Sequence, residues 1–350
     1  MRWLSYLLPR LALLVVAVAL PAGGGELYLR WFRPVLYRMP AAPVPDERWR
    51  GLVHRRSDIP GLSYELAPGR RVVHLGAGVQ TNRMGLRSYE PLPASDERVR
   101  IAVVGDSYAF GFGVQMRDTF ASVLERGLNT RAGRRPDSTD AQPPDSTVDY
   151  EVMNFGVGGY STLDEAAVVE HRVRPWAPAL IVLAYSMNDP EDAPIQPVHS
   201  FYSEVEPWQH SHLLRFVALT ALRHRIRRHG DGDYHRYLHR SPDKWATVQR
   251  GFARIARVAA QLETPVLVAI FPHCIVDLWA HYPLREQHRQ VADEARSHGF
   301  LTLDLLPAME QQHPRRVRLS RIDDHPNAMG HRLAGEQLIT YLRETELLDE

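Results

Sequence analysis

The stretch from Arg100 to Gly111 constrains the fold of this 350-residue chain more than any other. It opens with a short apolar run, Ile101 to Val104, as expected for a strand buried in the core of a sheet. The run ends in Gly105, Asp106 and Ser107, and a glycine-rich turn follows. Open α/β sheets bind their ligands at the carboxyl ends of the strands. The pattern therefore predicts a core strand that presents the Ser107 hydroxyl at the functional edge of a sheet.

Further apolar segments predict four more strands, and helical patterns separate them. Thr162 and Glu165, for example, are spaced as a capping box at the start of one such helix. Strands that alternate with helices form parallel sheets with helices on both faces. We therefore predict one α/β domain over residues 80–348, a three-layer α/β/α sandwich with a long insertion at 190–240. Its five strands are predicted at residues 99–104, 150–155, 179–185, 265–271 and 301–305.

The amino-terminal residues carry the pattern of an export signal. Arg2 and Arg10 precede an apolar run that extends to Ala22, as in the charged and apolar regions of a secretory signal. The uninterrupted run is shorter than the ~20 apolar residues that span a bilayer, but aromatic residues typical of a membrane interface follow it. We expect export with residues 1–25 kept as a membrane anchor, or, as the alternative, cleavage of this segment as a signal peptide. Residues 26–79 are predicted to be a juxtamembrane linker and an irregular lead-in.

Composition excludes several classes of function. The formal net charge is +1, so no overall field attracts nucleic acid. Cys274 is the only cysteine, so the chain forms no internal disulfide. Gly111 and Gly113 flank Phe112, but no Gly-Lys-Ser/Thr follows, so the turn is not a phosphate cradle.

A second chemical cluster lies near the end of the chain, where residues 323–327 read Asp-Asp-His-Pro-Asn. A serine hydroxyl becomes a good nucleophile only when a base takes its proton, and His325 is the candidate base. Such a histidine works best when a carboxylate holds its other ring nitrogen. We prefer Asp323 as that carboxylate because the side chains of adjacent residues diverge, and Asp324 is the alternative.

Acyl transfer also requires hydrogen-bond donors for the oxyanion of the tetrahedral intermediate. Three candidates follow the first three predicted strands: the backbone N–H of Ser107, the backbone N–H of Gly159 and the side-chain amide of Asn188. A glycine at 159 lets the backbone approach a substrate closely. Because parallel strands end at one edge of the sheet, we expect these donors to lie together.

Four segments in this order resemble the sequence blocks of the SGNH hydrolases, also called the GDSL esterase/lipase family. Residues 105–107 resemble its nucleophile block and 154–159 its glycine block, whose sixth position implies an oxyanion role for Gly159. Residues 186–189 resemble its Gly-x-Asn-Asp block, with Ser186 in place of the glycine. Residues 323–327 resemble its last block, although Ile322 stands where the commonest pattern has Asp, three residues before His325. The resemblance covers about residues 80–340 and implies a flavodoxin-like sheet and the hydrolysis or transfer of acyl groups.

Together these features predict an exported serine esterase that cleaves acyl esters, acetyl esters among them, of an envelope glycan or lipid. Asp323, Asp324, His325 and His331 are of residue types that also bind metal ions. A serine hydrolase uses the same residue types, so we predict no metal or organic cofactor. One alternative is an O-acyltransferase that passes the acyl group to a sugar hydroxyl. Another is a non-catalytic binding module, supported only by Ser186 and the shortened Asp-x-His spacing.

Overall fold

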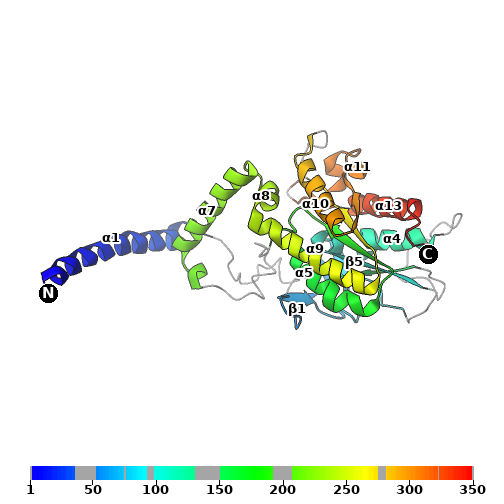
Figure 1. The fold of residues 1–350 in the computed structure, drawn as a ribbon, viewed down its shortest axis with the longest axis horizontal. Coiled ribbons are helices and arrows are strands. Elements are labelled where there is room, and N and C mark those ends of the chain that lie inside the picture. The colour runs from blue at the N-terminus through cyan, green and yellow to red at the C-terminus, as the bar shows by residue number, and fades with distance from the viewer. Residues whose placement is uncertain are drawn as a thin grey trace.

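The computed structural model has a central sheet of five parallel strands (Figure 1). Their order, β6-β5-β7-β8-β9, shows that the chain first moves from β5 to one side and then builds outward on the other. The predicted parallel five-stranded α/β/α sandwich is therefore confirmed. The strands are β5 (Val99–Gly105), β6 (Tyr150–Asn154), β7 (Leu180–Tyr185), β8 (Val266–Ile270) and β9 (Leu301–Asp304).

The structure describes the chain with gaps. Residues 192–206 of the predicted insertion lie outside the described residues. The structure describes residues 2–35, 53–74, 76–92, 98–130, 150–191, 207–274, 281–321 and 323–348.

Helices cover both faces of the sheet. α4 and α13 pack against each other on one face, and α5, α9 and α10 lie over the other, in front of the sheet in Figure 1. In α9 the residues Val248, Phe252 and Ile255 recur at helical spacing and are buried, as expected for one apolar face. These helices are α4 (Phe120–Asn129), α5 (Thr162–Val168), α9 (Pro242–Leu262), α10 (Arg285–Ser297) and α13 (Ala328–Glu344), and the shorter ones are α3 (Ser107–Phe110), α8 (Tyr234–Arg240), α11 (Leu306–Met309) and α12 (Pro314–Val317).

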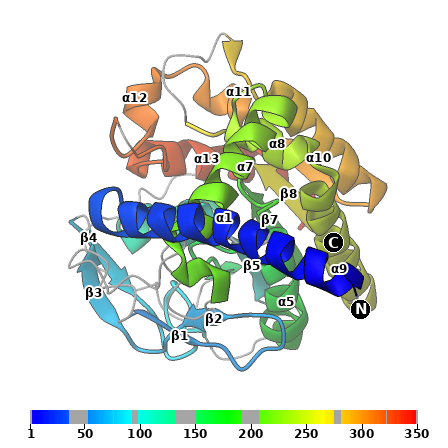
Figure 2. The same cartoon turned by 90° about the vertical axis from the view of Figure 1, so that its left-hand side faces the viewer.

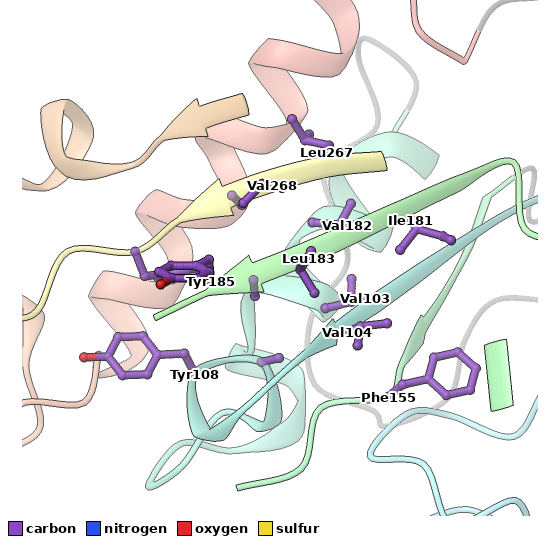
Figure 3. Close-up of a cluster of buried hydrophobic side chains, with 14 of the residues drawn as sticks. Val103, Val104, Tyr108, Phe155, Ile181, Val182, Leu183, Tyr185, Leu267 and Val268 are labelled. Atoms are coloured by element: carbon purple, nitrogen blue, oxygen red, sulfur yellow. The ribbon is translucent and has the colours of Figure 1, made fainter. Parts of the chain in front are cut away.

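The core lies between the sheet and these helices. Figure 3 shows Val103, Val104, Ile181 and Val182 on β5 and β7, and all four are fully buried. Because both faces of the sheet are covered, the central strands are apolar along their whole length and do not alternate with polar residues. Burial of each such side chain contributes about 1.5–3 kcal/mol, which fixes the sheet that carries the site.

The strand order reverses direction at β5. β5 lies between β6 and β7, and the connections to these two neighbours run over opposite faces. Ligands of open α/β sheets bind at such a reversal point. Ser107, Gly159 and Asn188 all follow strands that end there.

The helix after β6 starts one residue earlier than the sequence pattern indicates. Ser161 is the N-cap of α5, and its capping-box partner is Asp164. The predicted pair of Thr162 and Glu165 is therefore wrong by one position. Glu165 is instead fully buried beneath the carboxyl edge.

The lead-in is more regular than predicted. Its described residues form two antiparallel hairpins, β1 (His54–Arg56) with β2 (Tyr64–Leu66) and β3 (Arg71–His74) with β4 (Ala77–Gln80). Figure 2 shows both hairpins gathered on one side of the molecule. Strands of three or four residues carry too little alternation to be predicted from sequence.

The amino-terminal helix α1 (Arg2–Phe32) projects away from the α/β domain (Figure 1). Among the described helices, it alone has a segment, Pro9–Phe32, that is long and apolar enough to cross a membrane, a test that signal sequences also pass. The end of α1 contacts the start of α7 (His212–Gly230), where the Glu26 carboxylate accepts hydrogen bonds from Ser211 Oγ at 2.9 Å and Leu213 N at 2.8 Å. Helix α1 thus continues past the predicted boundary at residue 25.

Candidate active site

Ser107 is the first residue of α3, directly after the end of β5. Asp106 caps this short helix, and its Oδ1 accepts a hydrogen bond from Tyr108 N at 2.8 Å. The turn packs closely against the loop after β6, where a Cβ on Gly156 would lie 2.4 Å from Phe110 N. Only glycine fits at 156. The Gly-Asp-Ser turn therefore packs directly against the backbone of the glycine block.

His325 reaches this turn from a loop that hydrogen bonds hold in place. Leu319 N donates to the His325 carbonyl at 2.9 Å. Asn327 caps α13 with its Oδ1, while its Nδ2 donates to the carbonyls of Arg316 and Arg318 at 3.0 Å each. These hydrogen bonds connect the His325 loop to α12 and to the start of α13.

Ser107, His325 and Asp323 form one hydrogen-bonded series. His325 Nε2 lies 2.9 Å from Ser107 Oγ. On the other side of the ring, His325 Nδ1 lies 2.7 Å from Asp323 Oδ1, which also accepts from His325 N at 3.1 Å. Asp324 points elsewhere, and its Oδ2 lies 2.6 Å from His273 Nδ1. Of the two acids that the sequence offered, Asp323 is the one that contacts His325.

The surroundings of His325 favour its protonated form. Burial alone would lower the pKa of His325, but the hydrogen bond and the charge of Asp323 raise it above its ordinary value. The Phe112 ring lies 4.7 Å from the imidazole and the Tyr108 ring 5.5 Å from it, centroid to centroid. A base with these neighbours accepts a proton readily and keeps its orientation.

Asp106 Oδ2 links the nucleophile to the loop after β7. It lies 3.1 Å from Ser107 Oγ, 3.0 Å from Ser186 Oγ and 3.1 Å from Asn188 Nδ2. The second amide hydrogen of Asn188 remains available for a ligand in the described structure. Asn188 Oδ1 lies 2.7 Å from Ser186 Oγ. Ser186, which replaces the family's glycine, thus helps to orient the Asn188 amide.

Two carboxyl groups beneath this loop have raised pKa values. Burial and the nearby Asp106 carboxylate raise the pKa of Asp189 well above its usual range, although Ser186 opposes this shift. Asp189 Oδ1 lies 2.8 Å from Ser186 Oγ, and Asp189 Oδ2 accepts from Ser186 N at 3.0 Å. Burial, with Asp189 and Asp106 nearby, likewise raises the pKa of Glu165. Neither oxygen of Glu165 has a hydrogen-bond partner within the described structure.

The glycine pair after β6 is supported by the lead-in. Gly159 has a φ of +86°, in the left-handed region that favours glycine. Next to it, the Gly158 carbonyl accepts from Tyr64 Oη of β2 at 2.9 Å, and Tyr160 Oη donates to the Tyr64 carbonyl at 2.6 Å. The lead-in hairpin therefore fixes the backbone that carries the Gly159 N–H.

Arg87 is a supporting residue that the sequence analysis missed. Its side chain is buried, and its guanidinium donates to four backbone carbonyls, those of Gly78, Phe110, Gly111 and Val114. Burial lowers the pKa of Arg87 to about 10, so the group is still charged at pH 7. Three of these carbonyls belong to the loop that places Phe112 against His325. No local motif marks such a residue, because its partners lie far along the chain.

The carboxylates at this edge raise the question of a metal ion. Asp323, Asp324 and His325 are the one group of three potential ligands within 4.8 Å of one another among the described residues. Their contacts with each other and with His273 already engage them. His331 lies apart in α13, where its Nδ1 accepts from Phe120 N at 3.3 Å.

A model of the GDSL-like lipase/acylhydrolase family matches residues 103–333, which include Ser107, Gly159, Asn188, Asp323 and His325. The chain belongs to this family. It is an SGNH-type serine hydrolase that acts on carboxylic esters. The assignment rests on this family model. A search of curated proteins found no similar protein.

Several solved structures are similar to this SGNH hydrolase. TesA shares 16% identity at a TM-score of 0.44, over 71% of this chain and 99% of its own. The acetyl xylan esterase AlAXEase shares 15% identity at a TM-score of 0.44, over 70% of this chain and 100% of its own. A catalytic mutant of Axe2, an acetylxylan esterase from Geobacillus stearothermophilus, shares 16% identity at a TM-score of 0.42, over 72% and 95%.

Proposed function

We propose that this SGNH hydrolase cleaves acyl esters through an acyl-enzyme on Ser107. The observation that carries the proposal is the hydrogen-bonded series from Ser107 Oγ through His325 to Asp323. Ser107 Oγ attacks the ester carbonyl carbon while His325 Nε2 takes its proton. Asp323 stabilises the resulting imidazolium and keeps its orientation.

The oxyanion that forms is held by the N–H groups of Ser107 and Gly159 and by Asn188 Nδ2. His325 then gives its proton to the alcohol oxygen, the carbon–oxygen bond to the alcohol breaks, and the acyl group stays on Ser107. Water attacks this ester while His325 takes one of its protons. The bond to Ser107 Oγ breaks, the acid leaves, and the hydroxyl regains its proton.

The substrate that we propose is an ester of an envelope glycan or lipid on the exported side of a membrane. Its support is the apolar helix α1, which fits a membrane anchor or a signal peptide. α1 contacts α7 near its carboxyl end and extends away from the α/β domain (Figure 1).

The test is the hydrolysis of p-nitrophenyl acetate by the purified full-length protein in detergent. We expect turnover that Ser107→Ala lowers by roughly 10³-fold or more. Ser297→Ala, a change at an exposed hydroxyl of α10, is the matched control and should leave the rate unchanged. Adding a sugar acceptor separates the two enzyme reactions, since a transferase needs the acceptor for turnover. No hydrolysis with or without an acceptor would refute the proposal.

A further inference from the structure

A second Asp–His pair lies beside the proposed catalytic residues. His273 follows β8, and its Nδ1 lies 2.6 Å from Asp324 Oδ2, one residue before His325. His235 of α8 lies against it, with ring centroids 4.0 Å apart. His235 Nδ1 in turn lies 3.2 Å from the Met187 carbonyl, next to Asn188. The two imidazoles thus connect the loop of the proposed base to the loop of a proposed oxyanion donor, and the acyl transfer steps use neither of them.

The partners of these rings determine where their protons are. A carboxylate and a backbone carbonyl only accept hydrogen bonds, so both Nδ1 atoms carry a proton. Burial, together with His235, lowers the pKa of His273 to about 4, so this ring is neutral at pH 7. The Nε2 atom of His273 is then a hydrogen-bond acceptor, and the ring of His235 lies against it.

Both imidazole side chains are partly exposed to solvent. Neither Nε2 atom has a hydrogen-bond partner within the structure as described. Neither is among the buried polar atoms that lack a partner, so each retains contact with solvent. No third metal-ligating side chain of the described chain groups with the two rings. A ligand that supplies hydrogen-bond donors therefore fits better than a metal ion or an acyl chain.

We propose that His235 and His273 bind hydroxyl groups of a sugar-type alcohol, on the alcohol side of the ester cleaved at Ser107. This inference rests on the proposed function. His325 gives its proton to the leaving alcohol, so the alcohol must lie on the side of the His325 loop, to which Asp324 attaches His273. A hydroxyl acceptor in a transfer reaction would occupy the same subsite, because it reverses the path of the leaving alcohol.

The test compares two acetyl esters in the full-length protein. A monosaccharide monoacetate offers free hydroxyls on its alcohol side, and p-nitrophenyl acetate offers none. His273→Phe and His235→Phe should each lower the ratio of kcat/KM for the sugar ester to that for the nitrophenyl ester by ~10-fold or more. His273→Gln keeps a carbonyl acceptor and should lower the ratio less. His298→Phe, which removes a Glu-paired histidine at the opposite edge of the sheet, is the matched control and should leave the ratio unchanged.

An unchanged ratio in both phenylalanine variants would overturn the subsite, and so would loss of sugar-ester turnover on treatment with a metal chelator. A separate measurement needs no turnover: binding of a methyl monosaccharide to Ser107→Ala protein, followed by NMR saturation transfer. We expect His273→Phe in this background to abolish that binding, and unchanged binding would overturn the inference. Failure of both esters to react with the unsubstituted protein would instead contradict the proposed function, while the binding measurement would still decide the subsite.

Discussion

In the proposed mechanism, the proton on His325 decides when Ser107 can react. A protonated imidazole cannot take the Ser107 proton, and Asp323 raises the pKa of His325 above its ordinary value. The sequence predicted these three residues because each lies in a short motif after a predicted strand or before a predicted helix, and the structure places their side chains within hydrogen-bond distance of one another. The contact of His235 with His273 was not predictable, since the two residues are far apart in the chain and belong to no motif.

We expect kcat/KM for p-nitrophenyl acetate to fall as the pH is lowered, with a midpoint above the ordinary histidine pKa of about 6.5. Asp323→Asn should move this midpoint to lower pH, because it removes the charge that raises the pKa, and should lower kcat by roughly 10³–10⁴-fold. A pH–rate profile of both proteins measures this. A rate that stays flat from about pH 5 to 8 would contradict a histidine base.

Glu165 gives a prediction about stability. Its pKa is raised in the folded protein, so between the unfolded and folded pKa values the folded state binds more protons. Stability from this group is therefore present below the unfolded pKa and is lost as the pH rises toward the folded one.

Glu165→Gln removes this dependence. We expect the difference in Tm between the variant and the unsubstituted protein to move in favour of the variant from pH 5 to pH 9, as measured by thermal unfolding. Glu344→Gln, near the end of α13, is the control. A difference that stays constant over this range would mean that Glu165 is not held protonated.

At the scale of secondary-structure elements, the sequence predicted the five-stranded sheet but not the two hairpins of the lead-in or the exact start of α5. The five strands are apolar along their length and end at glycine, polar or proline-containing segments, so the sequence predicted each of them to within two residues. The hairpins β1–β2 and β3–β4 are too short to show a period. The start of α5 was placed one residue late because Thr162 and Glu165 have the same spacing as the true capping pair, Ser161 and Asp164.

Arg87 tests how the lead-in supports the site. Arg87→Met leaves four carbonyls without this donor, and we expect it to lower the free energy of unfolding by about 3 kcal/mol, as measured by urea unfolding. Arg83 lies nearby but is exposed, and its ion pair with Glu90, at 3.6 Å, is also exposed. Arg83→Met should therefore change the free energy of unfolding by less than ~1 kcal/mol. Equal effects of the two changes would contradict a special role for Arg87.

At the scale of the whole molecule, our proposal for where the hydrolase works rests on α1. Pro9–Phe32 is apolar and exposed to solvent in the described structure, which suits a helix that lies in lipid. The helix is also continuous through residue 32, and Glu26 attaches its end to the start of α7. Sequence composition indicated a membrane or export segment but could not show that this segment extends to a contact with the insertion.

We expect the full-length protein to stay in the membrane fraction after an alkaline carbonate wash, with residues 1–25 still present in its intact mass. Val16→Arg, at the middle of the apolar segment, should weaken this retention because an arginine at the bilayer centre costs at least ~2.5 kcal/mol. Val73→Arg, at an exposed apolar position of β3, is the matched control. A soluble mature protein that begins after residue 22 would show that the segment is a cleaved signal.

The identity of the nucleophile is tested most directly by covalent labelling. The full-length protein is treated with a fluorophosphonate, and the modified peptide is mapped by mass spectrometry. We predict a single adduct on Ser107, absent in Ser107→Ala and formed much more slowly in His325→Ala. An adduct on another residue, or none at all, would contradict the account.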